Sequence, residues 1–522
     1  MPDEDHTILP ARIVKPRSRK YKRLPILVIT PHHYYTEDGE YFTGPIDLPA
    51  MPSTLFVTIG AGDFIAALDA TYSKSHPDAW QWHVTTQEKG IVRPGGERVA
   101  ARVTAVVKQF GFKNGNYHKI IDPVVMYGRK LDEIWPGNEP DYIRLMRWGQ
   151  AVRDFCHENG MEVRPTIGSL GGQFLTDRRF YPNARRKVPR AINDRARENL
   201  PGNHYGLAVA PSPEREFNAW YVDQRRAHHH HAANTILPDA DNLYAHGRFT
   251  DLGDIGTMPL EVNDDFYGLY CLHLQVPKRH HLMWHWIRPA APYDFVFSNE
   301  LPLLLDMGYK VNAVIAAWGS HSQDGGIKRY ATWANQQLDD HGDAAWLKPL
   351  LLATYGTLAT RPTWGEAVFR LAKRGQEATV YTGRRSLTGL QVRKPVKLEP
   401  GIANVIHRGM IEAAARAESI ELARLFATIN FRVLAIYADA VIVQQPTDDR
   451  QLPPLPEPWR LKTTLTHLQF INKQAFMSGE MTKTPGVNRE IRAYTQRSPG
   501  HAPRRRLWDV MLHREVQTDR RI

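Results

Sequence analysis

Short apolar runs alternate along the chain with longer segments whose apolar positions follow the helical repeat. β-branched and apolar runs at residues 24–30 and 54–59 predict strands. Helical spacing predicts helices over residues 98–110, 145–158 and 401–427. The pattern therefore indicates a fold that mixes sheets with helices.

Turn residues and charge add further predictions. The glycine-rich residues 166–172 predict a domain junction, and the proline-rich residues 452–458 predict a linker. Residues 333–362 are expected to be mostly helical. Residues 378–394, which are strongly basic, predict a β-hairpin with a glycine turn, and residues 462–473 predict a helix.

Composition narrows the class of protein. The 522 residues suffice for several domains, and 67 Lys and Arg against 55 Asp and Glu leave a net charge of +12. A basic excess favours a polyanionic partner such as nucleic acid, with solubility or a membrane-surface preference as the alternatives. Only two cysteines occur, Cys156 and Cys271, which excludes a disulfide framework or a cysteine zinc site and fits a reducing cytosol.

One apolar run ends on a single acidic residue, and a second apolar run is interrupted by one. An aromatic and β-branched run leads into Asp223, and Asp439 interrupts the apolar residues 432–443. Between them, Lys348 and Tyr355 lie seven residues apart and share one face of a predicted helix. A strand that ends on an acid presents a carboxylate at a sheet edge, so we interpret these residues as parts of one site.

The order and separations of these motifs resemble the family B DNA polymerases, in particular the protein-primed branch of phages and linear plasmids. The first motif of that family is a hydrophobic strand and then D-x-x-S-L-Y-P. Its place is taken here by residues 223–229, in which Asp223 agrees and Arg226, Ala227, His228 and His229 stand at S-L-Y-P. The second is K-x-x-x-N-S-x-Y-G, and here Lys348, Tyr355 and Gly356 stand in the matching places.

The third motif of the family, Y-x-D-T-D-S, allows two alignments. In the first, Asp439 takes the place of the second, metal-binding Asp, and Tyr437 replaces the first Asp. A shifted alignment puts Val441 at the essential Asp and implies an inactive protein. We adopt the first alignment.

The resemblance implies site residues. Asp223 and Asp439 would be catalytic and would hold two Mg²⁺ ions, with Mn²⁺ as a substitute, because hard oxygen ligands suit Mg²⁺. The residues expected to bind the nucleotide are Lys348, Tyr355, His228 and Arg226. His228 stands where the family has the tyrosine that excludes ribonucleotides. Arg226 either meets the triphosphate or points to solvent.

Basic residues supply the candidates for DNA contact. A strongly basic segment that includes Arg185, Arg186 and Lys187 leads into a loop with Tyr205 and Gly206. The resembled polymerases grip the template with such a loop, since cations neutralise phosphates and glycine allows close backbone approach. The alternative is a solvated loop. Lys473 stands where the family has a lysine that contacts the primer.

The resembled family carries a 3′–5′ exonuclease at its N-terminus, which needs clustered carboxylates beginning with Asp-x-Glu on an apolar strand. The only early Asp-x-Glu here is Asp38-Gly39-Glu40, which lies in a polar segment. The spacing of Asp63, Asp69 and Asp122 identifies no site. We therefore expect this domain not to proofread.

The predicted architecture is α+β: a right-hand polymerase of palm, fingers and thumb, with a degenerate N-terminal ribonuclease-H-like exonuclease-type domain. The expected domains are the exonuclease-like domain 1–165, palm 166–250 and 401–447, a terminal-protein insertion 251–332, fingers 333–365, a basic hairpin insertion 366–400 and thumb 448–522.

The resemblance implies a DNA-directed DNA polymerase, a nucleotidyltransferase that replicates a phage or mobile-element genome from a protein primer. Its partners would be a DNA template, deoxynucleoside triphosphates and a terminal protein. It is expected to be a monomer in the cytoplasm of a bacterial host, with no membrane association. The alternative is a catalytically degenerate polymerase-fold protein that binds DNA or a terminal protein. A metal nuclease built from His228 to His231 with Asp223 is a third reading, which no partner motif supports.

Overall fold

The computed structural model divides into two compact units. The first consists of Met1–Arg179 with Gln336–Thr354, and the second of Phe180–Asn335 with Tyr355–Ile522. Each is described by itself. The residues that the structure describes are 24–30, 33–42, 54–59, 80–86, 101–108, 118–121, 124–128, 131–163, 167–177, 180, 193–194, 196–197, 206–209, 212, 215–239, 244–246, 262, 265–275, 277, 294–359, 363–370, 379–381, 391–398, 403–437, 439–448, 450–470, 476–478 and 481–483.

The first unit contains a five-stranded sheet in which the predicted strands form the centre. β1 pairs in parallel with β4, and β4 pairs in parallel with β8. Their apolar residues are buried against the long helix α3 (Asp141–Glu158), so the predictions for residues 24–30, 54–59 and 145–158 are confirmed. The spatial order is β3 (Tyr41–Phe42), β2 (Tyr34–Thr36), β1 (Ile26–Ile29), β4 (Leu55–Thr58) and β8 (Val124–Tyr127).

A second sheet of this unit overturns one helix prediction. Residues 98–110 were expected to be helical, but β6 (Ala101–Lys108) is the middle strand between β5 (Trp80–Thr86) and β7 (His118–Ile121). The segment ARVTAVVK is rich in valine and threonine, whose branched side chains favour strands over helices. Strand pairing therefore overrode the helical spacing.

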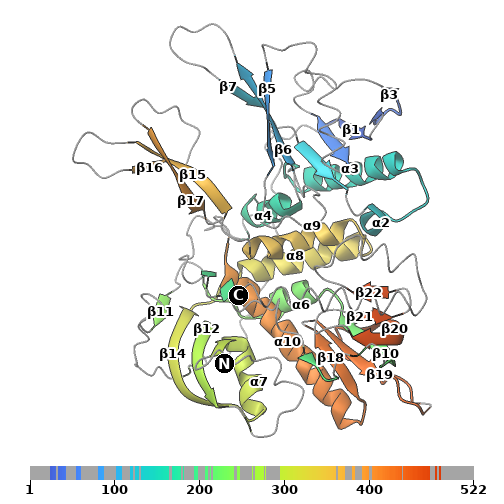
Figure 1. Cartoon of the computed structure of the whole chain (residues 1–522), viewed down its shortest axis with the longest axis vertical. Coiled ribbons are helices and arrows are strands. Elements are labelled where there is room, and N and C mark those ends of the chain that lie inside the picture. The colour runs from blue at the N-terminus through green and yellow to red at the C-terminus, as the bar shows by residue number, and fades with distance from the viewer. Residues whose placement is uncertain are drawn as a thin grey trace, which may run out of the picture. The chain divides into compact units, whose positions relative to one another are not determined.

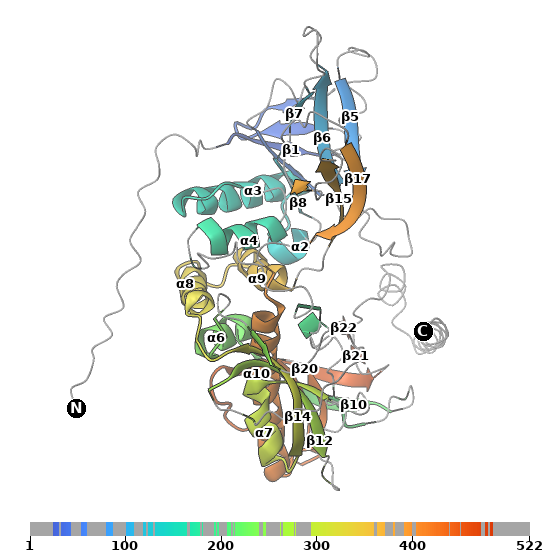
Figure 2. The ribbon, with the colours of Figure 1, turned by 90° about the vertical axis from the view of Figure 1, so that its left-hand side faces the viewer.

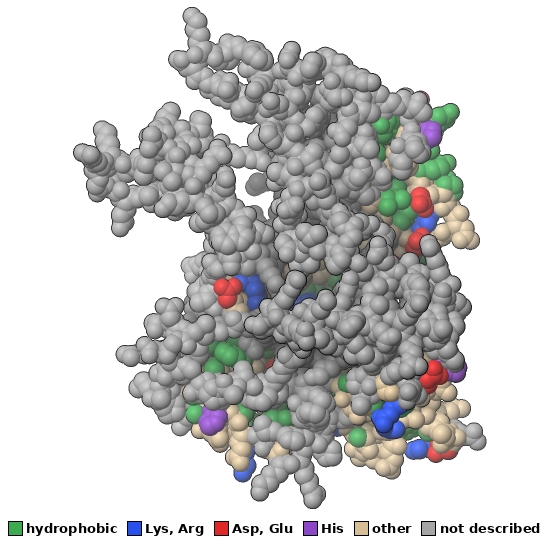
Figure 3. Space-filling view, in the orientation of Figure 1, with side chains coloured by type: hydrophobic (Ala, Val, Ile, Leu, Met, Phe, Trp, Pro, Cys, Tyr) green, Lys and Arg blue, Asp and Glu red, His purple; other side chains and the backbone are tan. Residues whose placement is uncertain are grey.

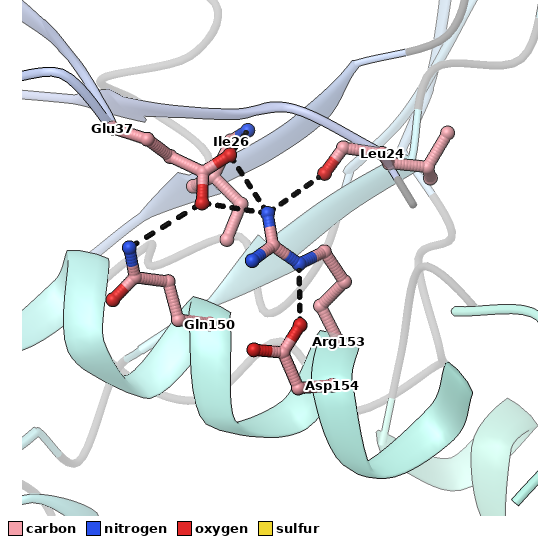
Figure 4. A network of polar contacts seen from close by, with 6 residues as sticks. All are labelled: Leu24, Ile26, Glu37, Gln150, Arg153 and Asp154. Carbon is pink, nitrogen blue, oxygen red and sulfur yellow. Dashed lines mark hydrogen bonds and ion pairs between the residues drawn. The ribbon is translucent and has the colours of Figure 1, made fainter. Parts of the chain in front are cut away.

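A polar network ties the β2–β3 turn to α3 (Figure 4). Arg153 Nη1 donates to Glu37 Oε1 at 2.6 Å and to the carbonyl of Leu24 at 3.0 Å. Glu37 also accepts from the backbone N–H of Ile26 at 3.1 Å and from Gln150 Nε2 at 3.3 Å. The turn that follows Glu37 carries the Asp38-Gly39-Glu40 segment, so this Asp-x-Glu lies in a loop, as the sequence predicted.

The glycine-rich residues 166–172 are not a junction. Residues 167–172 begin α4 (Ile167–Asp177), whose Gly171 approaches α9 (Leu347–Leu358) closely: a Cβ at this position would lie 2.5 Å from the backbone of Ala353 and Thr354. Thr354 Oγ1 also donates to the Gly171 carbonyl at 3.0 Å. The glycine thus permits close helix packing. A short helix, α2 (Leu131–Ile134), precedes α3.

The second unit is built on a seven-stranded sheet. Its central strand β10 pairs antiparallel with β19 on one side and with β20 on the other. Residues 462–473 were predicted to be helical, but β20 spans most of them, with threonine-rich sequence that suits a strand. The spatial order is β22 (Met481–Lys483), β21 (Phe476–Ser478), β20 (Trp459–Phe470), β10 (Phe217–Gln224), β19 (Ala440–Gln444), β18 (Val433–Tyr437) and β9 (Gly206–Leu207).

The long helix α10 (Val405–Thr428) lies between this sheet and a four-stranded sheet (Figure 1). One hydrophobic core joins the three, with Trp220 and Val222 of β10, Phe426 of α10 and Tyr270 of the second sheet among its members. The predicted helix at 401–427 is thus confirmed. The second sheet has the order β11 (Tyr244–His246), β14 (Lys310–Ser320), β12 (Tyr267–Gln275) and β13 (Asp294–Phe297).

A buried ion pair fastens α10 to the short helical segment that follows β13. Arg416 Nη2 lies 2.5 Å from Glu300 Oε1, and the side chains are only 4% and 5% exposed. Glu300 also accepts from the backbone N–H of Phe297 at 3.3 Å. Burial raises the pKa of Glu300, and Arg416 opposes that rise. Glu300 ends η3 (Ser298–Glu300), which leads into α7 (Leu301–Asp306).

The remaining elements correct the predicted basic hairpin. β16 (Thr379–Tyr381) and β17 (Gln391–Leu398) do not pair with each other; each pairs with β15 (Thr363–Arg370), which lies between them. The helices α8 (Gly326–Asp340) and α9 confirm the helical content expected over 333–362. Among the described residues, no helix has both the length and the apolar character needed to cross a membrane.

Candidate active site

Asp223 lies at the end of β10 on the face of the sheet turned away from α10. Side chains alternate along a strand, so Tyr221 and Asp223 share one face, while Val222 and Gln224 share the other. Val222 enters the core beside α10, whereas Tyr221 packs in the separate core of the opposite face. The Asp223 side chain is 10% exposed.

Asp439 lies in the turn between β18 and β19, next to the end of β10. Tyr437 pairs with Ala440 across this turn, and Asp223 faces Ala440 on the neighbouring strand. The backbone N–H of Gln224 donates to the Asp439 carbonyl at 3.0 Å. The fold thus brings the two predicted acids, 216 residues apart in the chain (439 − 223), into adjacent backbone positions.

The shifted alignment of the third motif falls at a different kind of position. Val441 is fully buried in the core that contacts α10. It faces Val222 on β10 and Ile436 on β18, one residue out of phase with Asp223. An acid at this position would point into the apolar core rather than to the face that carries Asp223.

Two basic side chains from β20 neutralise Asp223. Lys462 Nζ is 2.8 Å from Asp223 Oδ2 and Arg460 Nε is 3.1 Å from Asp223 Oδ1, with Lys462 and Arg460 45% and 49% exposed. Lys462 also lies 5.1 Å from the centre of the Tyr221 ring. Neither residue was predicted from the sequence: a helix was expected from residue 462, and Arg460 was assigned to no element. Their two-residue spacing in a threonine-rich run was the available signal.

The four histidines after Asp223 divide between two environments. They belong to α6 (Ala227–Asn234). His229 Nδ1 is 2.9 Å from the Tyr355 hydroxyl, and the ring centre of His228 is 5.7 Å from that of Tyr355. His230 and His231 instead face Glu418 of α10, and Figure 2 shows α6 beside that helix.

Gln224 links the second pair of histidines to α10. His231 Nε2 is 2.7 Å from Gln224 Oε1, and Gln224 Nε2 donates to Glu418 Oε2 at 3.0 Å. Burial, with a smaller effect from His230, lowers the pKa of His231 to about 3, so this imidazole is neutral at pH 7. Burial raises the pKa of Glu418, which His230 opposes.

Another carboxylate of α10, that of Glu412, lies within electrostatic range of Asp439. Burial raises the pKa of Glu412; the charges of Arg408 and Arg416 lower it, and the charge of Asp439 adds to the rise. Glu412 forms an ion pair with Arg408, one helical turn away. Arg408 also acts on Tyr355, whose pKa is raised by burial and partly lowered by that cation.

The predicted nucleotide-binding residues occupy different environments. Tyr355 is fully buried, so its expected place against a nascent base pair stays a prediction. Lys348 is exposed on the same helix, α9. Arg226 precedes α6 with a left-handed backbone (φ 53°) and donates to the Asn335 carbonyl at 3.3 Å. His228 is half-buried beside Tyr355.

Most predicted DNA contacts fall outside the described residues: Arg185, Arg186, Lys187, Tyr205 and Lys473, as do Asp63, Asp69 and Asp122. Gly206 is described and pairs with Ile436 at the edge of the seven-stranded sheet. On the face drawn in Figure 3, described acidic and basic side chains are interspersed. The predicted DNA contacts therefore stay predictions.

The residues around Asp223 fit a site for Mg²⁺. Asp223 and Asp439 offer the carboxylate oxygens that this ion prefers. Arg460 and Lys462 hold the Asp223 oxygens, but both side chains are about half exposed and can rotate into solvent. Asp223 and Asp439 have adjacent backbones, and their joint binding of Mg²⁺ stays a prediction.

Comparison with solved structures identifies the fold. The structure matches Phi29 DNA polymerase with primer-template DNA and incoming nucleotides at a TM-score of 0.55, with 12% identity over 90% of this chain and 93% of that chain. Phi29 DNA polymerase with primer-template DNA and with single-stranded DNA each match at 0.53, with 12% and 13% identity over the same shares. No family model matches the sequence, and neither does any curated protein.

These matches confirm the resemblance to the protein-primed family B DNA polymerases at the level of the fold. The mixed α+β fold that the sequence predicted resembles that of Phi29 DNA polymerase. At 12% identity the likeness concerns the fold alone. The degeneracy of the N-terminal domain and the roles of the site residues stay predictions.

Proposed function

We propose that this protein is a DNA-directed DNA polymerase that uses a protein primer and two-metal nucleotidyl transfer to replicate a phage or mobile-element genome. The observation that carries the proposal is the adjacency of the Asp223 and Asp439 backbones, at the end of the central strand of a sheet in a polymerase-like fold. The polymerase structures of similar fold were solved with DNA and nucleotides, which supports the same classes of partner here.

In this proposal the chain's own residues hold the metal ions and add positive charge near the nucleotide. Mg²⁺ held by Asp223 and Asp439 would lower the pKa of the primer hydroxyl and stabilise the pyrophosphate leaving group. Lys348 adds positive charge for the triphosphate of the incoming nucleotide. His228 takes the place of the sugar-selecting tyrosine. The primer hydroxyl belongs to a Ser, Thr or Tyr of a terminal protein.

A primer-extension assay tests this function. The full chain is incubated with a labelled, primed template, deoxynucleoside triphosphates and Mg²⁺, and the products are separated by length. Metal-dependent elongation is the expected result, and addition of Mn²⁺ in place of Mg²⁺ should also support it. Binding of the template without elongation would contradict the polymerase proposal, and shortening of the labelled strand would indicate a nuclease.

A second candidate is a polymerase-fold protein without catalysis that binds DNA or a terminal protein. The ion pairs of Asp223 with Arg460 and Lys462 favour it, because they place positive charge where metal ions would have to bind. Tyr437, in the place of the first acid of the third motif, favours it too. The same assay separates the two candidates, since this one predicts template binding alone.

Under the polymerase proposal, Lys462 competes with the metal for Asp223. Lys462→Met removes the charge but keeps an unbranched stem against Tyr221, so we expect the Mg²⁺ concentration for half-maximal elongation to fall. A half-exposed ion pair is worth up to about 1 kcal/mol, which corresponds to a fall of roughly two- to fivefold. A Mg²⁺ titration of elongation measures it.

Lys310→Met, which removes an exposed lysine from β14, is the matched control and should leave the titration unchanged. An unaltered half-saturating Mg²⁺ concentration in Lys462→Met would contradict the competition. Weaker elongation at every Mg²⁺ concentration would instead indicate that Lys462 contacts DNA or nucleotide.

A further inference from the structure

Two imidazoles and a carboxylate converge between α6 and α10. His230 Nε2 is 3.7 Å from Glu418 Oε1, and His231 Nε2 is 3.6 Å from Glu418 Oε2. One potential ligand atom from each residue lies within 4.8 Å of the other two. The histidine run alone did not predict this pair, because four consecutive residues cannot all face one ion. The fold turns two of the rings toward a carboxylate that lies 187 positions after His231 (418 − 231).

The distances between these atoms are close to the distances between the ligand atoms of a bound transition metal. Bonds of about 2.0–2.2 Å place tetrahedral zinc ligands roughly 3.3 Å apart, so modest side-chain rotations would bring the three atoms onto one ion. His231 is buried, whereas His230 and Glu418 are about one-third exposed, which leaves a solvent path to the site. Two nitrogens and one oxygen suit Zn²⁺, and imidazole disfavours Mg²⁺.

Gln224 is placed to orient the carboxylate ligand. It contacts His231 through Oε1 and Glu418 through Nε2. Residues that hydrogen-bond to metal ligands fix the orientation of those ligands and strengthen metal binding. When His231 Nε2 binds an ion, its contact with Gln224 Oε1 is given up, and this amide oxygen lies beside the ion.

We propose that His230, His231 and Glu418 form a binding site for Zn²⁺ that clamps α6 to α10 on the face of the sheet opposite to the Asp223 carboxylate. The site is separate from that carboxylate because successive residues of β10 point to opposite faces. It is nevertheless connected to the polymerase-like site through the backbone, since Gln224 follows Asp223 and donates to the Asp439 carbonyl. The ion would therefore hold the end of β10 in place.

Metal binding by the full chain tests this proposal without reference to polymerase activity. Chelator-treated protein is titrated with Zn²⁺ by equilibrium dialysis, and the visible spectrum is recorded with Co²⁺ as a substitute. We expect one tightly bound Zn²⁺ per chain, a tetrahedral Co²⁺ spectrum and a rise in Tm on addition of Zn²⁺. A hundredfold excess of Mg²⁺ should not displace the zinc.

Single substitutions assign the ion to these residues. His230→Ala, His231→Ala and Glu418→Gln should each weaken Zn²⁺ binding by more than about 100-fold and abolish the Co²⁺ spectrum, since loss of an orienting residue alone costs about 10–100-fold. His273→Ala, which removes an exposed histidine of β12, is the matched control and should bind as the unmodified protein does.

The test remains decisive even if substitution of the buried His231 prevents folding. If His231→Ala fails to fold by circular dichroism, His230→Ala decides the matter, because that side chain is partly exposed. Zinc affinity that is equal in the unmodified protein and in a His230→Ala/Glu418→Gln double variant would overturn the proposal. The three side chains would then form only a hydrogen-bonded contact between two helices.

Discussion

Replacement of Asp439 by asparagine should abolish elongation while leaving DNA binding intact. Asn keeps the size of the side chain and its place in the β18–β19 turn but removes the charge that would hold Mg²⁺. We expect elongation to fall by several orders of magnitude, because the reaction depends on positioned metal charge. Template binding should survive, since it rests on basic residues.

Two further variants make this experiment specific. Tyr437→Phe should have a mild effect, because the family residue in that place is not the indispensable ligand. Asp448→Asn is the matched control: Asp448 pairs with Arg450 on the surface after β19, so its loss should leave elongation unchanged. Elongation rates and filter binding of a primed template measure the two properties separately.

A lack of elongation by the unmodified protein would contradict this prediction. If it folds and binds DNA but shows no Mg²⁺-dependent elongation, there is no activity for Asp439→Asn to lose. The candidate without catalysis would then be the better description, and Arg460 and Lys462 would be permanent partners of Asp223.

Loss of Arg416 should strongly destabilise the second unit. Arg416→Met removes the cation of a fully buried pair and leaves the Glu300 carboxylate in the core, which costs about 3–5 kcal/mol in the free energy of unfolding. Because burial already raises the pKa of Glu300, this carboxyl should take up a proton in the variant. Chemical denaturation followed by tryptophan fluorescence measures the loss.

The double variant Glu300→Gln/Arg416→Met separates the buried charge from lost packing. Glutamine can still accept the Phe297 backbone N–H, so much of the stability should return. Arg424→Met, on the same helix, breaks an exposed pair with Asp306, in which the side chains are 46% and 64% exposed, and should cost less than about 1 kcal/mol. Equal losses in Arg416→Met and Arg424→Met would show that the buried pair contributes nothing special.

The predicted strands and helices were correct where neighbouring residues carry the pattern. Continuous apolar runs located β1 and β4, and helical spacing of apolar positions located α3 and α10, because burial leaves a pattern in neighbouring residues. The order of short motifs pointed to the polymerase fold and singled out Asp223 and Asp439, which the fold brings to adjacent positions. Prediction of secondary structure was wrong where helical and strand patterns overlap. The segments of β6 and β20 are strands rather than helices because of the strands they pair with.

Only the tertiary structure determined which side chains meet. The register of β20 against β10 brings Arg460 to Asp223 from 237 residues away, and no local pattern encodes a register. The rotation of α6 likewise divides four identical histidines between Tyr355 and Glu418. The sequence by itself therefore indicated the class of fold and proposed the two acids. Long-range pairing decided the charges that surround them and the histidine pair that faces α10, because such contacts depend on chain segments that are distant in sequence.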